Sequence, residues 1–142
     1  LKNFVNFYNR LMLKEAHLSK LEREMIAVVV SSCNKCFYCL IAHGAAVRQL
    51  SKNQYLGDEL MINYRSASLN KRHKLMLDFS FKLTENPSKV DNSDRNILRE
   101  AGFSEEEILE IVEVASFFNM SNRIAAGTDM RPNAEYHNMG RE

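Results

Sequence analysis

Hydrophobic positions recur at intervals of three and four residues along most of this chain, which predicts helices rather than strands. The first such stripe runs from Phe4 to Leu11. A capping box at Ser19–Glu22 then opens a second helix, which continues through the apolar run Met25–Val30 toward Cys33. Because apolar residues lie almost all round this second helix, we expect it to be buried.

The same periodicity predicts five more helices. Their expected ranges are 37–50, 54–64, 71–83, 94–101 and a long last helix from a capping box at 104–107 through Ile124. The polar segment 128–142 is expected to be irregular. With no repeat and no linker, the chain is predicted to form a single domain over residues 1–142, an all-α compact bundle of six to seven helices. Because it begins with Leu1 rather than Met, we expect the N-terminus to be incomplete.

Composition narrows the classes of function. The chain has 142 residues, of which 45% are hydrophobic and 26% charged, as in ordinary globular proteins. A net charge of +1 gives no reason to expect nucleic acid or an anionic membrane as a partner. The longest apolar run, Met25–Val30, is too short to cross a bilayer. Three clustered cysteines are a poor disulfide framework, so we expect a reducing, cytoplasmic compartment and either redox chemistry or metal binding.

The candidate chemistry lies at the start of the third predicted helix. Cys36, Cys39 and His43 are spaced by three and four residues, so they share one stripe of that helix. A Cys-x-x-Cys pair at a helix N-terminus suits redox work, because the helix dipole stabilises a thiolate and the spacing allows a disulfide. His43 lies one turn beyond Cys39, and we expect the two to exchange a proton.

Glu24 joins this group if the second and third helices form a hairpin about residues 34–35. It then lies about 15 Å before the turn, and His43 lies about 12 Å after it, at 1.5 Å per residue. The carboxylate and the imidazole are therefore expected nearly level on neighbouring helices. A carboxylate beside an imidazole beside a thiol forms a proton relay.

The arrangement Glu24-x11-Cys36-x2-Cys39-x3-His43 resembles the signature of the alkylhydroperoxidase D and carboxymuconolactone decarboxylase family. Three surrounding segments are similar to its peroxidase-related branch: residues 21–30, 36–44 and 117–123. The resemblance implies an all-helical fold that assembles into homo-oligomers, as trimers, hexamers or dimers.

The resemblance also implies a reaction and assigns roles. Members of the family reduce hydroperoxides through a cysteine pair, without a bound cofactor or metal. Cys39 would be the peroxidatic thiol that becomes a sulfenic acid, and Cys36 would resolve it into a disulfide. Glu24 and His43 would be the relay that deprotonates Cys39. A thiol, or a dithiol reductant protein, would then reopen the disulfide.

Two positions depart from the family pattern. The family places a second histidine just before the second cysteine, where this chain has Tyr38, whose phenol is a poor base near neutral pH. Tyr38 is therefore expected to support the site by packing, with weaker peroxidase activity or a different substrate as the consequence. Cys33 is an additional thiol, expected to belong to the core. Dipole reasoning alone favours Cys36, nearer the helix start, as the more acidic thiol.

The same residues are compatible with other functions. Cys33, Cys36, Cys39 and His43 copy the spacing of an iron–sulfur or zinc site, so a metal-binding module is one alternative. A thiol–disulfide oxidoreductase without peroxidase activity is another. Two further alternatives are a non-redox lactone decarboxylase and a purely structural oligomer. The isolated histidines are expected at the surface: His17, His73 and His137.

Overall fold

A computed structural model describes residues 1–142, and it confirms the predicted all-helical fold, with seven α-helices and no strand. The helices are α1 (Lys2–Tyr8), α2 (Lys20–Cys33), α3 (Phe37–Ser51), α4 (Leu56–Asn63), α5 (Lys71–Glu85), α6 (Asn92–Glu100) and α7 (Glu105–Gly127). A π-helical turn, Asn9–Leu13, extends α1, and three short 3-10 turns lie at Tyr64–Ser66, Pro87–Lys89 and Ala134–His137. No helix combines the length and the apolar character that a membrane crossing requires.

Local capping explains where the helices begin. The capping boxes predicted at Ser19 and Ser104 are both present, with each serine accepting a hydrogen bond from the N–H three residues later. A third capping box at Asp91 was not predicted, and it starts α6 at Asn92 rather than Asp94. The predicted helix 54–64 begins later, at Leu56, because Asn53 turns the chain by accepting the Tyr55 N–H.

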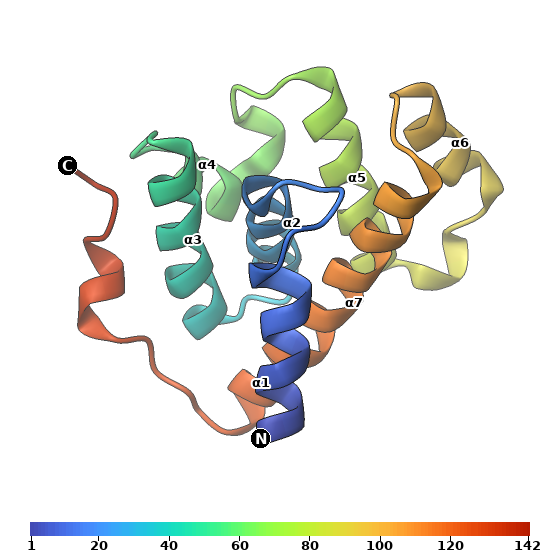
Figure 1. The fold of residues 1–142 in the computed structure, drawn as a ribbon. Coiled ribbons are helices and arrows are strands. Elements are labelled where there is room, and N and C mark those ends of the chain that lie inside the picture. The colour runs from blue at the N-terminus through green and yellow to red at the C-terminus, as the bar shows by residue number, and fades with distance from the viewer.

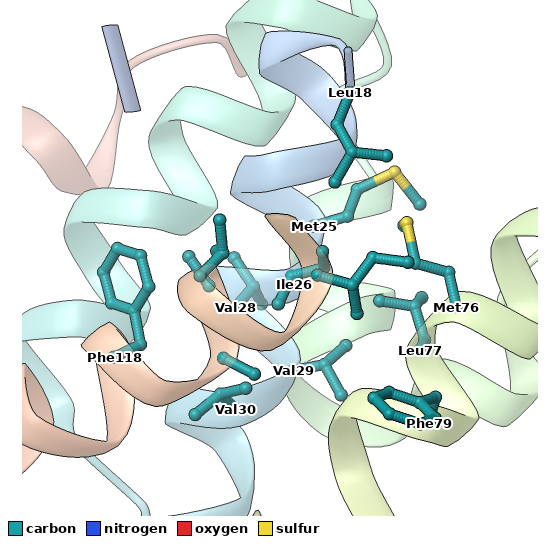
Figure 2. Packing of buried hydrophobic residues seen from close by; sticks show 14 of the residues in the cluster. Leu18, Met25, Ile26, Val28, Val29, Val30, Met76, Leu77, Phe79 and Phe118 are labelled. Carbon is teal, nitrogen blue, oxygen red and sulfur yellow. The ribbon is translucent and has the colours of Figure 1, made fainter. Parts of the chain in front are cut away.

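Helix α2 lies at the centre of the bundle, as its apolar surface predicts. It packs against α3, α4, α5 and α7, and every residue from Glu22 to Ser31 is buried. Figure 1 shows α2 behind α1 and between α3 and α7. In Figure 2 the side chains of Ile26 and Val29 face those of Met76 and Leu77, while Val28 lies toward Phe118.

Two buried arginines attach the ends of the chain to this core. Arg23 of α2 donates to the carbonyl oxygens of Leu11 and Lys14 at 2.8 and 2.9 Å, which holds the end of the first helical segment. Arg48 of α3 is 1% exposed and donates to two carbonyl oxygens of the C-terminal segment, those of Tyr136 and Met139. These bonds place α1 and the segment 128–142 on either side of α3, where Figure 1 shows them.

Candidate active site

The α2–α3 hairpin brings the predicted residues together. α2 ends at Cys33, and the next residues turn the chain through a left-handed backbone at Lys35, where φ is +54°. Asn34 fixes the turn against α7, because its amide donates to the Oδ1 atoms of Asn119 and Asn122 at 2.9 and 3.0 Å. The hairpin therefore forms at the residues that the sequence predicted, 34–35.

Glu24 and His43 lie level on the two arms of this hairpin and form a buried pair. Nδ1 of His43 lies 2.6 Å from Oε2 of Glu24, and the two residues are 8% and 6% exposed. A carboxylate only accepts hydrogen bonds, so Nδ1 carries the proton and donates. The Phe118 ring lies edge-on to the imidazole at 4.6 Å and helps to fix its plane. The only hydrogen bond of the ring is the one through Nδ1, so Nε2 is the nitrogen free to exchange a proton.

Cys36 and Cys39 are in direct contact and are not joined by a disulfide. The Cys36 thiol donates to the Cys39 sulfur at 2.7 Å, and the Cys36 sulfur accepts the Cys39 N–H at 3.4 Å as the N-cap of α3. Burial, reinforced by the bond from Cys36, raises the pKa of Cys39 to about 12, although Asn122 and Ser121 act in the opposite direction. The thiolate stabilisation expected from the helix N-terminus is thus outweighed at Cys39 by desolvation, and this thiol needs a base.

The link between the two pairs is not a direct hydrogen bond, since none joins His43 to either sulfur. The deprotonation of Cys39 by His43 therefore stays a prediction. Ser121 is the residue shared by the two pairs. It lines the same cavity as His43, and its hydroxyl acts to lower the pKa of the Cys39 thiol.

The third cysteine lies apart from this group. Cys33 is half-buried at the end of α2, where burial and then the charge of Glu85 on α5 raise its pKa. No three His, Cys, Asp or Glu side chains are arranged to hold a metal ion. The four donors of the metal-binding alternative, Cys33 among them, are therefore not gathered around one point.

A largely apolar cavity adjoins the Glu24–His43 pair, and we name it the chamber. Its volume is about 610 Å³, and 11 of its 14 lining residues are hydrophobic. Walls come from α1 through Phe4 and Tyr8, from α3 through Ala46, and from α7 through Ile124. The C-terminal segment closes one side with Tyr136. Such a space suits an apolar organic substrate with one polar end.

Several residues around the site were missed by sequence reasoning. Asn122 is 2% exposed and donates to the Ser31 hydroxyl at 2.9 Å while it accepts from Asn34. Its only sequence signal is its position four residues after Phe118, on the otherwise apolar buried face of α7. Tyr8 was counted only as part of an apolar stripe, yet it lines the chamber, where burial and then the Glu24 charge raise its pKa.

The remaining predicted positions are Tyr38 and the three isolated histidines. Tyr38 lines the chamber, and burial raises its pKa above its ordinary value, so it stays a neutral phenol near pH 7. His17 and His137 are exposed, as predicted. His73 is only partly exposed, because 22% of its side chain is accessible and it pairs at 3.1 Å with the buried Glu22.

Comparison with known proteins identifies relatives that share this fold. The model of the carboxymuconolactone decarboxylase family matches residues 1–54. A peroxidase-related protein from Silicibacter sp. TM1040 is 56% identical, with a TM-score of 0.97, and the match covers 99% of this chain and 73% of that one. The alkylhydroperoxidase AhpD core, a peroxidase-related protein from Ralstonia eutropha JMP134, is 40% identical, with a TM-score of 0.96 over 99% of this chain and 74% of that one.

The chain thus belongs to the carboxymuconolactone decarboxylase family, among its alkylhydroperoxidase D-like members. The debrominase Bmp8, solved with 2,3,4-tribromopyrrole, shares the fold at 18% identity and a TM-score of 0.80, covering 95% of this chain and 71% of that one. No protein with a curated description matches significantly.

Proposed function

We propose that this protein is a thiol-dependent peroxidase that reduces organic hydroperoxides through Cys36 and Cys39. The observation that carries the proposal is the joint placement, on one hairpin, of a contacting cysteine pair and a buried Glu24–His43 pair beside an apolar chamber. The family and the peroxidase-related solved structures support it.

The reaction starts at Cys39. His43 accepts the Cys39 proton through Nε2 once the peroxide is bound, and the thiolate attacks the outer peroxide oxygen. The O–O bond breaks, Cys39 becomes a sulfenic acid, and the alkoxide takes the proton back from Nε2 of His43 and leaves as an alcohol. Tyr38 lines the chamber as a neutral phenol, so its role is to donate a hydrogen bond to the leaving oxygen and not to act as a base.

The second step forms the disulfide. The Cys36 sulfur attacks Cys39 and the S–O bond breaks, and the hydroxyl leaves as water with the proton of the Cys36 thiol. The 2.7 Å contact between the two sulfurs supports this step. An external thiol or dithiol must then reduce the disulfide, so the protein needs a reductant but no resident cofactor or metal. Assembly into a homo-oligomer and a cytoplasmic location belong to the same proposal and rest on the family resemblance.

The experiment is steady-state turnover of cumene hydroperoxide with dithiothreitol. Cys39→Ser should abolish turnover, while Cys33→Ser, the matched control, should retain it. In Cys36→Ser, dimedone labelling after one equivalent of peroxide should mark Cys39 as the sulfenic acid. Turnover that survives Cys39→Ser, or dimedone on Cys33 instead, would overturn the assignment.

A second candidate is a thiol–disulfide oxidoreductase without peroxidase activity. Two observations favour it: Tyr38 replaces the family's second histidine, and no hydrogen bond joins His43 to a sulfur. Rapid reduction of oxidised dithiothreitol or glutathione by the reduced protein, without hydroperoxide turnover, would select this function instead.

A further inference from the structure

The cysteine pair lies between two separate cavities. Besides the chamber, a small cavity of about 170 Å³ opens over the start of α3, and we name it the Cys36 pit. Cys36 lines the pit and not the chamber, whereas Glu24 and His43 line the chamber and not the pit. Cys39 is 1% exposed and lines neither.

A shared wall separates the two spaces. Tyr38 of α3, Ala125 of α7 and Met130 of the C-terminal segment line both cavities. Tyr38 and Ala125 also pack directly around the two sulfurs. A molecule that occupies the chamber is therefore on the opposite side of this wall from one that occupies the pit.

Thiol–disulfide exchange requires that the reductant reach one particular sulfur of the disulfide. The incoming thiolate attacks one sulfur of the disulfide while the other leaves, so the attacked sulfur must be accessible to the reductant. Of the two cysteines only Cys36 lines the pit, so it is the one that a thiol in the pit meets. Attack there expels the Cys39 sulfur, which is the one that must be free for the next peroxide.

We propose that the Cys36 pit is the entrance for a small thiol reductant, separate from the chamber that admits the peroxide. This proposal rests on the proposed thiol redox function. In its step, a thiolate RS⁻ attacks Cys36 of the Cys36–Cys39 disulfide, forming an RS–Cys36 bond and releasing Cys39 as a thiolate. A second RS⁻ attacks the RS sulfur of that mixed disulfide, and RSSR leaves with Cys36 as a thiolate.

The size and charge of the pit define the reductant. Its volume is less than a third of the chamber's, so it admits a thiol on a narrow stem rather than a folded domain. Asp129 and Arg131 pair at 3.3 Å, which leaves Lys35 as the charged lining residue without an ion-pair partner. The excess positive charge favours a thiolate or a thiol that bears a carboxylate.

Ping-pong kinetics allow the two entrances to be tested separately, because kcat/KM for peroxide and kcat/KM for thiol report different half-reactions. Ala126 lines only the pit, and Ala46 lines only the chamber. Ala126→Leu should lower kcat/KM for 3-mercaptopropionate by about fivefold or more and leave that for cumene hydroperoxide within about twofold. Ala46→Leu should do the reverse. In each variant the unaffected half-reaction shows that the protein is folded.

Charge selectivity provides a second test. Lys35→Asn keeps the left-handed backbone, which asparagine tolerates, and removes the charge. It should reduce the preference for 3-mercaptopropionate over cysteamine by about threefold, as expected for one charge several ångströms away in water. An unchanged preference would contradict the role of Lys35 and remove the basis for an anionic reductant.

The site of attack can be found without any peroxide. Protein oxidised with diamide is treated with 3-mercaptopropionate, quenched with N-ethylmaleimide and mapped by mass spectrometry. The proposal predicts the mercaptopropionate adduct on Cys36 and N-ethylmaleimide on Cys39. An adduct on Cys39, or an equal effect of Ala126→Leu on both half-reactions, would overturn it. Because oxidation here comes from diamide, this result is independent of whether the protein is a peroxidase.

Discussion

The buried Glu24–His43 pair gives the sharpest prediction. Glu24→Gln keeps the size of the side chain and its hydrogen bond to Nδ1 but removes the charge that stabilises an imidazolium. The two groups are 2.6 Å apart and both nearly inaccessible to solvent. The perturbation therefore acts directly on the ability of His43 to take a proton.

The magnitude follows from Coulomb's law. Charge centres about 4 Å apart at an effective dielectric constant of about 20 interact by about 4 kcal/mol, which sets a ceiling of about 1000-fold in rate. If the proton is about half transferred in the transition state, the loss is about 2 kcal/mol, or about 30-fold. We expect kcat/KM for cumene hydroperoxide to fall by about 30-fold near pH 7.

Glu22→Gln is the matched control, because Glu22 belongs to the same helix but pairs with Arg72 and His73 away from the chamber. It should lower stability and leave kcat/KM for peroxide within about twofold. The assay is peroxide consumption at saturating thiol, with thermal melting of both variants. If Glu24→Gln kept wild-type kcat/KM, or if Glu22→Gln lost as much, the Glu24–His43 relay would be refuted.

Three further predictions concern protonation and stability. Because burial holds the pKa of Cys39 at about 12, labelling of Cys39 by iodoacetamide in the reduced protein should accelerate about tenfold per pH unit from pH 7 to 10. Peptide mass spectrometry measures this rate, and a plateau below about pH 9 would contradict the raised pKa. Burial opposes ionisation of Glu22, but bonds from His73, Ser19 and Arg72 outweigh it and lower its pKa from 4.5 to about 2. The stabilisation by ionised Glu22 is therefore complete above pH 4.5 and is lost as the pH falls toward 2. After allowance for partial solvent screening, urea unfolding should show a loss of about 2 kcal/mol over this pH range. Glu22→Gln should not show this pH-dependent loss. Arg48→Met should cost about 2 to 4 kcal/mol in the same assay, because two carbonyl oxygens lose a buried cationic donor, and should expose residues 128–142 to trypsin; an unchanged cleavage pattern would show that Arg48 does not hold this segment.

Much of the fold was predictable because helices are local structures. Capping boxes at Ser19 and Ser104, and the spacing of apolar residues between them, depend only on neighbours in the chain. The π-turn after α1 and the capping box at Asp91 were missed, since both depend on short-range detail that periodicity does not report. The single-domain prediction and the expected oligomer remain predictions.

Some features of the site were likewise predictable from local sequence, and others were not. The meeting of Glu24 with His43 was predictable, because a constant rise per residue and a turn at 34–35 set their heights. Cys33 was expected in the core but is only half-buried, because its exposure depends on how α2 is rotated about its axis. Asn122, Ser121 and Tyr8 reach the site from other helices, and no local pattern indicates which side chain of a distant helix faces it.

The sequence by itself determined the helices, the hairpin and the identities of two pairs of reactive groups. Tertiary structure alone decided their environment: how deeply Cys39 is buried, which cavity each group lines, and that a wall of Tyr38, Ala125 and Met130 divides the two cavities. The reason is physical. Helix formation follows from neighbours a few residues apart, whereas desolvation and access depend on side chains that packing brings together from distant parts of the chain.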